Sequence, residues 1–151
     1  MREADPDAAI ERLALKLLGI REHSRLELSR KLAARGFSPS EVGPVLDRLA
    51  AQGALDEDRL AELYVAERIR KGFGPLRIRR ELQEKGLPDS AIEPHLSAMA
   101  GDWPAHLAAA HARRYGAEPP GDRDELARRA RFLEQRGFPS EAIRRFLRWN
   151  D

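Results

Sequence analysis

Cysteine is absent from this chain of 151 residues, which excludes disulfide bonds, thiol catalysis and thiolate metal sites. Aromatic residues make up only 6% of the sequence, so any core must consist mainly of aliphatic side chains. No apolar run approaches the length of a membrane span, and the N-terminus has no signal-peptide pattern. We therefore expect a cytoplasmic globular protein with no membrane partner.

Charged residues of both signs are plentiful, and the formal net charge is only +2. The distribution is uneven, because residues 68–85 hold 7 basic and 2 acidic side chains. Arginine forks suit phosphate and carboxylate groups, so this cluster is a candidate partner-binding surface. The alternative is a solvated helix face, on which Glu81 and Glu84 pair with Arg77 and Arg80 at helical spacing. Either way, we expect Arg77 and Arg80 to be exposed.

Three glycines stand in matching surroundings at nearly equal intervals. Gly36, Gly86 and Gly137 are 50 and 51 residues apart. Each follows a basic residue, precedes a large apolar residue and has a leucine four positions upstream. Self-similarity at such a period is typical of tandem copies of one supersecondary unit, and such arrays present an extended surface to partners.

The neighbours of these glycines predict how each preceding helix ends. Glycine adopts the left-handed conformation at the position after the C-cap without a Cβ penalty, and the next residue then packs on the last helical turn. For Gly36, the residues that would make this contact are Leu32 and Phe37. The corresponding pairs are Leu82 with Leu87 and Leu133 with Phe138. We therefore predict structural caps at Gly36, Gly86 and Gly137.

Apolar residues recur with helical spacing throughout the chain, and no segment of useful length alternates as a strand would. Helix-start signals include Asp5-Pro6, the capping box from Ser24 to Glu27, and Asp122. The prediction is an all-α fold of three tandem three-helix repeats in an elongated, curved array. The predicted units are residues 1–53, 54–100 and 101–151.

Other motifs favour structural roles. Gly72-Phe73-Gly74 lacks the strand and Lys-Ser/Thr of a phosphate loop, so we expect a tight helix–helix turn. His106 and His111 are five apart and do not share a helix face, which argues against a metal pair. Trp103 and Trp149 fit core packing better than stacking on bases. With no nucleophile, metal or acid–base set, we expect no enzymatic activity, no cofactor and no metal.

Two stretches of the sequence resemble a known family. Ala54-Leu55-Asp56-Glu57-Asp58-Arg59-Leu60-Ala61 and the stretch from Lys71-Gly72-Phe73-Gly74-Pro75 to Gly86 are similar to the central repeat of the RecX family of recombination regulators. Residues 14–36 resemble the first repeat of that family. Leu60 stands where the family usually has phenylalanine, which is a conservative change in a core position.

The resemblance implies a regulator with no catalytic centre that binds the RecA filament and reduces strand exchange, ATP hydrolysis and co-protease action. It also implies contact with single- or double-stranded DNA. The alternative is a direct DNA-binding protein, because three-helix units of this size resemble helix-turn-helix modules. We expect a monomer that binds its partner through a basic face. That face would comprise Arg68, Arg70, Lys71, Arg77, Arg80, Arg128, Arg129, Arg144 and Arg145.

Overall fold

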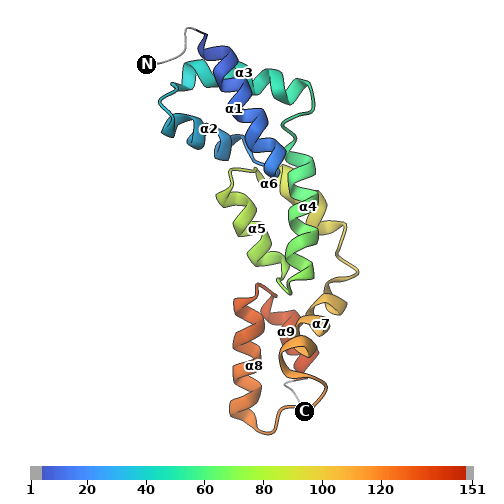
Figure 1. The fold of residues 1–151 in the computed structure, drawn as a ribbon. Coiled ribbons are helices and arrows are strands. Elements are labelled where there is room, and N and C mark those ends of the chain that lie inside the picture. The colour runs from blue at the N-terminus through green and yellow to red at the C-terminus, as the bar shows by residue number, and fades with distance from the viewer. Residues whose placement is uncertain (1–4, 149–151) are drawn as a thin grey trace.

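The computed structural model describes residues 5–148, and within that range the chain forms nine α-helices and no strand (Figure 1). The helices are α1 (Pro6–Ile20), α2 (Arg25–Ala34), α3 (Pro39–Ala51), α4 (Glu57–Arg70), α5 (Pro75–Glu84), α6 (Asp89–Ser97), α7 (Trp103–Tyr115), α8 (Arg123–Gln135) and α9 (Ser140–Leu147). This confirms the predicted all-α class. Across the same range, no helix combines the length and the apolar character that a membrane span requires.

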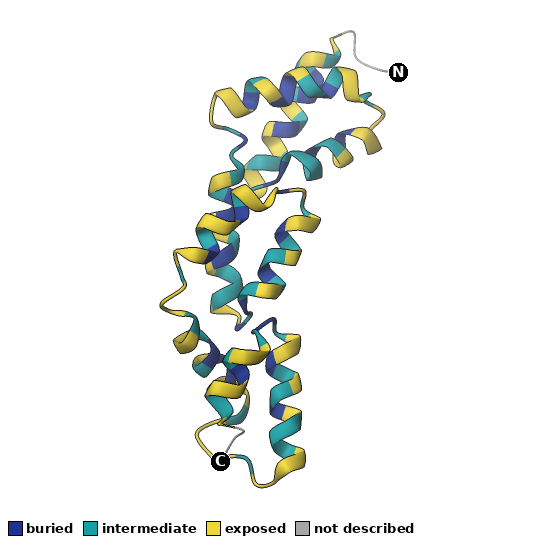
Figure 2. Ribbon diagram, turned by 180° about the vertical axis from the view of Figure 1, so that it is seen from behind, coloured by how far each residue is buried: buried dark blue, intermediate teal, exposed yellow. Residues whose placement is uncertain are grey.

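Successive triplets of helices form three units stacked end to end, with the first and third units at opposite ends of the elongated array (Figure 1). Each unit has its own aliphatic core: the first is centred on Leu32 and Leu46, the second on Leu82 and Ile92, and the third on Leu133. Buried residues lie on the helix faces turned toward one another within a unit (Figure 2). Because the fold has three small cores in place of one central core, its surface area is large relative to its volume.

All three predicted glycine caps are left-handed. The φ angles are 92° at Gly36, 94° at Gly86 and 99° at Gly137. The N–H of Phe37 bonds the carbonyl of Leu32 at 3.3 Å, as the motif requires. The equivalent bonds, from Leu87 to Leu82 and from Phe138 to Leu133, are each 3.1 Å long. Local sequence therefore determines where α2, α5 and α8 end.

Two of these glycines also lie at the junctions between units. A Cβ on Gly86 would stand 2.7 Å from Cβ of Leu26, at the start of α2 in the first unit. A Cβ on Gly137 would stand 2.4 Å from Cβ of Arg77, at the start of α5 in the second unit. A Cβ on Gly36 would meet nothing within 4 Å. The same turn thus docks each later unit on its predecessor, and in the first unit this turn is open.

The third unit differs from the other two in where its second helix begins. Counting back from the glycine caps, Ser24, Gly74 and Glu125 occupy equivalent positions, and the first two are the N-caps of α2 and α5. In α8 the N-cap is Asp122 instead, so that helix begins three residues earlier. The main chain amide of Glu125 donates to the Asp122 carboxylate at 2.8 Å, which fixes this earlier start.

Candidate partner-binding surface

Phe73 lies at the centre of the junction between the second and third units. It follows Gly72, whose φ is 92°, and precedes Gly74, the N-cap of α5. The amide of Gly74 donates to the Arg136 carbonyl at 2.7 Å, and a Cβ on Gly74 would stand only 2.7 Å from the Gly137 carbonyl. The segment is therefore a tight turn between α4 and α5, as predicted, and its glycines allow the third unit to approach closely.

Three arginines gather around the Phe73 ring. The guanidinium carbon of Arg68 lies 3.7 Å from the ring centroid, and those of Arg77 and Arg136 each lie 4.5 Å from it. A cation placed over an aromatic ring is attracted by the ring's negative face. The ring therefore brings together positive charge from α4, α5 and the C-terminal end of α8.

Glu81 is the carboxylate that balances part of this charge. It accepts hydrogen bonds from Nε and Nη2 of Arg68, each 2.9 Å, from Nε of Arg77 at 3.2 Å, and from the Tyr64 hydroxyl at 2.9 Å. Burial raises the pKa of Glu81, but the bonds from Arg68, Tyr64 and Arg77 outweigh it, so its pKa lies below the usual value. Burial and the Glu81 carboxylate raise the pKa of Tyr64 to about 12. Arg68 and Arg77 are therefore ordered parts of the fold.

The expectation that Arg77 is freely exposed is therefore wrong. Its side chain is only 34% exposed, and its Nη1 donates to the Gln135 carbonyl at 3.1 Å across the junction. Arg80, in contrast, is 65% exposed, and its contact with Glu84 is 3.9 Å long. Fork-like guanidinium donors near the start of α5 can hold a neighbouring carbonyl because their geometry is fixed.

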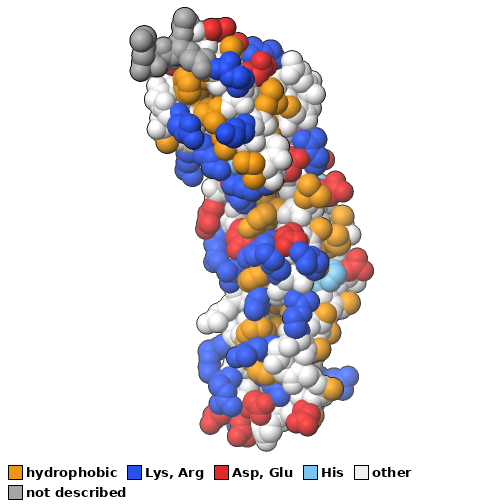
Figure 3. Space-filling model, in the orientation of Figure 1, with side chains coloured by type: hydrophobic (Ala, Val, Ile, Leu, Met, Phe, Trp, Pro, Cys, Tyr) orange, Lys and Arg blue, Asp and Glu red, His pale blue; other side chains and the backbone are white. Residues whose placement is uncertain are grey.

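The other predicted residues of the basic face fall into two groups. Arg70 and Lys71 are exposed at the end of α4 and both pair with Glu67, Lys71 at 3.3 Å. The third unit contributes Arg128, Arg144 and Arg145, which are also exposed. On the face shown in Figure 3, Lys and Arg side chains lie over all three units, the second and third included.

Arg129 does not belong to this face. It is 3% exposed and occupies the core position that Leu28 and Ile78 fill in the other units, eight residues before the glycine cap. Its Nη2 pairs with Glu125 at 2.6 Å, and its Nη1 donates to the Glu118 carbonyl at 2.8 Å. Its Nε has no partner among the described residues. A buried, paired arginine is inaccessible to a partner, so its inclusion was wrong.

Three further arginines, which the sequence did not single out for the basic face, are close to the same junction. Arg113 and Arg114, at the end of α7, line a pocket of about 130 Å³ together with Arg136. The remaining lining residues are Lys71, Gly72, Ala110 and Phe132. Arg136 is the basic residue before the Gly137 cap, and the repeat pattern showed it only as a neighbour of that glycine. Arg113 and Arg114 are adjacent in the sequence, but the sequence alone does not show that they lie near the end of α4.

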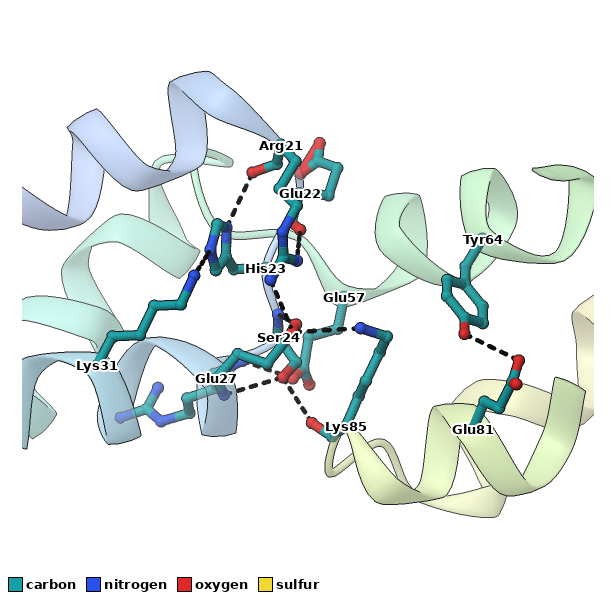
Figure 4. Close-up of polar contacts among 11 residues, drawn as sticks. Arg21, Glu22, His23, Ser24, Glu27, Lys31, Glu57, Tyr64, Glu81 and Lys85 are labelled. Carbon is teal, nitrogen blue, oxygen red and sulfur yellow. Dashed lines mark hydrogen bonds and ion pairs between the residues drawn. The ribbon is translucent and has the colours of Figure 1, made fainter. Parts of the chain in front are cut away.

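The junction between the first and second units is built differently (Figure 4). The Ser24 hydroxyl donates to the Lys85 carbonyl at 2.5 Å, and Nζ of Lys85 lies 3.2 Å from the Glu27 carboxylate. Burial raises the pKa of Glu27, but hydrogen bonds from the Ser24 amide, Arg21 and Lys85 outweigh it and lower that pKa to about 2. Arg59 also pairs with Glu22 across this junction. Each basic side chain named here has a carboxylate partner.

Trp103, His106 and His111 make contacts within the fold. Trp103 is partly buried between the second and third cores, and its Nε1 donates to the Leu96 carbonyl at 3.2 Å. Trp149 lies outside the described residues. His111 is buried, and His106 contacts the Trp103 ring. Within residues 5–148, no three His, Asp or Glu side chains form a group that could hold a metal ion.

Three family models match the chain in the same order as its units. Their descriptions are RecX, first three-helix domain, over residues 11–49; RecX, second three-helix domain, over residues 56–96; and RecX, third three-helix domain, over residues 104–147.

Similar proteins and structures agree with these matches. The regulatory protein RecX of Halorhodospira halophila is 46% identical over 136 residues, which cover 90% of this chain and 84% of the relative. The regulatory protein RecX of Pseudomonas syringae pv. tomato is 43% identical over 95% of this chain and 92% of the relative. The crystal structure of RecX from Lactobacillus salivarius superposes with a TM-score of 0.80 at 20% identity, covering 97% of both chains. The chain therefore belongs to the RecX family.

Proposed function

We propose that this protein binds the RecA recombinase filament and inhibits its recombinase, ATPase and co-protease activities. The proposal rests on the family, two of whose members named above are called regulatory proteins, and on the arginine-rich surface around Phe73. We define this basic face by its exposed or partly exposed members. They are Arg68, Arg70, Lys71, Arg77, Arg80, Arg128, Arg144 and Arg145.

The observation that carries the proposal is the placement of this face on an elongated array. Its members come from both the second and the third unit, which lie one after the other along the molecule (Figure 1). Contacts spread over such a length can engage successive subunits of a filament, and linked weak contacts act at a high effective concentration. The protein should therefore bind assembled filaments far better than free RecA monomers, and it needs no chemistry of its own.

The experiment titrates the protein against preformed RecA filaments while ATP turnover and filament length are followed. The test variant is Arg70→Glu with Arg80→Glu, because both side chains are largely exposed, at 72% and 65%. The control is Arg30→Glu with Arg35→Glu, on exposed residues of α2 and its C-cap whose side chains make no hydrogen bond or ion pair among the described residues. We expect about a tenfold loss of filament binding in the test variant and little change in the control.

A second candidate function is direct DNA binding. The three-helix units and the surplus of arginine around Phe73 favour it. DNA binding alone should weaken steeply as salt is raised, because neutralised phosphates release counterions. Binding to a protein filament should retain an apolar component that salt does not weaken. Unchanged ATP turnover and filament length, together with tight binding to naked DNA, would favour this second function over the first.

A further inference from the structure

The pocket at the junction of the second and third units is lined by positive charge from three separate elements. Lys71 comes from the end of α4, Arg113 and Arg114 from the last turn of α7, and Arg136 from the end of α8. No carboxylate from the described part of the chain lines it. Like charges repel one another when brought together, so such a group of side chains is arranged to suit an anion.

The arginines of this pocket are also unpaired. Among residues 5–148, the side chains of Arg113, Arg114 and Arg136 form no ion pair with a carboxylate. Lys71 alone has such a partner, Glu67, at 3.3 Å. At the neighbouring Phe73, by contrast, Glu81 balances Arg68 and Arg77. The uncompensated charge is therefore concentrated in the pocket.

One of these arginines is held in place before any ligand arrives. Nη1 of Arg136 donates to the Lys71 carbonyl at 3.3 Å, and its guanidinium lies 4.5 Å from the Phe73 centroid and 5.0 Å from that of Phe132. Burial lowers the pKa of Arg136, and the nearby Arg77 and Arg113 lower it further. Arginine nevertheless stays protonated at neutral pH. The fixed side chain costs less conformational entropy when it binds.

A glycine also lines the pocket, next to Arg113. Gly72 is left-handed, with φ of 92°, and a Cβ there would stand 3.5 Å from Nη1 of Arg113. A larger side chain would fill the space between Arg113 and the α4–α5 turn. Arg113 and Arg136 both line this pocket, so an anion bound in it can contact both guanidinium groups.

We propose that this pocket binds a backbone phosphate of nucleic acid, with Arg113, Arg114 and Arg136 as its donors. A carboxylate is satisfied by one guanidinium fork. A phosphodiester presents two anionic oxygens that point apart, and its neighbours along the strand continue the negative charge, which suits donors from three directions. The inference rests on the second candidate function, direct DNA binding, and assigns a site to it; it does not depend on the proposed RecA binding, because the contact needs no RecA.

The test measures binding of the full chain to a single-stranded oligothymidine of about twenty nucleotides, without RecA, by fluorescence anisotropy. The variant is Arg113→Ala with Arg114→Ala. Both residues are exposed, and neither side chain makes a hydrogen bond among the described residues, so the fold should be retained. The control, Arg30→Ala with Arg35→Ala, removes the same charge from α2 and its C-cap. Thermal melting monitors the fold of all three proteins.

We expect the pocket variant to bind the oligonucleotide at least tenfold more weakly, and the control to bind within about twofold of the wild type. The slope of log affinity against log salt should also become shallower by about 0.7 for each phosphate that the variant no longer neutralises. A matching methylphosphonate oligomer has an uncharged backbone. The wild type should bind it weakly, and its preference for the charged oligomer should shrink in the pocket variant.

Three results would overturn the proposal. One is equal weakening of binding in the pocket variant and the control, which would show a diffuse effect of net charge. Another is wild-type binding of the methylphosphonate oligomer that is as tight as binding of the charged one. The third is a pocket variant that binds the oligonucleotide normally but no longer binds RecA filaments, which would make the pocket a contact for an acidic protein surface.

Discussion

At both junctions of this molecule, the glycine turn of one unit packs on the start of the second helix of the unit before it. Different chemistry holds the two junctions together. At the first junction, the Ser24 hydroxyl and the Glu27 carboxylate bind Lys85, beside the Gly86 turn. At the second, main chain amides hold the turn, since Gly74 and Leu76 donate to the carbonyls of Arg136 and Gly137 at 2.7 and 2.9 Å. Two arginine side chains add to this main chain contact, since Arg77 donates to the Gln135 carbonyl and Arg136 to the Lys71 carbonyl.

The difference determines where charge is left over. Lys85 has Glu27 as a partner at the first junction, and Arg59 has Glu22. At the second junction one carboxylate, Glu81, faces several guanidinium groups. Repeated architecture thus does not imply repeated electrostatics: the basic side chains named at the first junction have carboxylate partners, whereas positive charge is left over at the second.

The largest effects are expected when a valine replaces each glycine cap. Gly137→Val should lower the free energy of unfolding by about 3 kcal/mol or more, because its Cβ meets the Arg77 backbone at 2.6 Å in addition to the left-handed penalty. Gly86→Val should cost about 2–3 kcal/mol, since its Cβ meets Cβ of Leu26 at 2.7 Å but no main chain atom as closely. Gly36→Val should cost only about 1–2 kcal/mol, because its surroundings are open. Urea unfolding of the three variants measures the series.

Gly36→Val serves as the internal control of this series, because it has the same backbone strain without a neighbouring unit. Equal losses of stability in the three variants would contradict the idea that the close approach of the units contributes to stability.

The next effect concerns the first junction and depends on pH. Glu27→Gln should lower the free energy of unfolding by about 2 kcal/mol at neutral pH, because the wild-type carboxylate has a pKa of about 2 in the folded state. A lowered folded pKa contributes stability above the unfolded value of 4.5, and this contribution is lost as pH falls through about 2. The difference between wild type and variant should therefore shrink between about pH 5 and pH 2.

Chemical denaturation at a series of pH values measures this difference. A gap that stays constant down to about pH 2 would mean that the ion pair with Lys85 contributes little, and that the glutamine disturbs packing instead. Glu84→Gln, on an exposed residue of α5, is the matched control.

The smallest changes in stability are expected for charge reversal at two arginines of α5 near the second junction, and they should differ between the two. Arg77→Glu should cost about 1–2 kcal/mol, because it removes the bond to the Gln135 carbonyl and places a carboxylate beside Glu81. Arg80→Glu should change stability by less than about 0.5 kcal/mol, since the side chain is largely exposed. Melting curves compare the two. If the two variants melt alike, Arg77 does not help to hold the third unit.

Sequence reasoning was sufficient wherever the structure depends on near neighbours. Gly36, Gly86 and Gly137 could be placed as caps because a left-handed residue and its apolar contact lie within six residues of one another. The capping box of Ser24 and Glu27 also formed as predicted, with the Glu27 carboxylate 2.9 Å from the Ser24 amide. The all-α class followed from such signals and from the helical spacing of apolar residues.

The surface could be predicted only in part, because it depends on how distant elements meet. Arg129 was predicted to belong to the basic face, but aligning the repeats by their glycine caps shows that it occupies the core position of Leu28 and Ile78. The pocket arginines were missed for another reason. Arg113 and Arg136 are more than twenty residues apart in the chain, and only the packing of α7 and α8 against the α4–α5 turn brings them together.

The early start of α8 has a consequence for assembly. A further unit docking as the second and third do would place its glycine turn on the N-terminal end of α8, as Gly86 and Gly137 do on α2 and α5. The additional residues from Asp122 to Asp124 lie in that position. A glycine turn placed on α8 in the way that Gly86 and Gly137 sit on α2 and α5 would therefore meet these residues, so the contact that joins the units is not offered in the same form at α8.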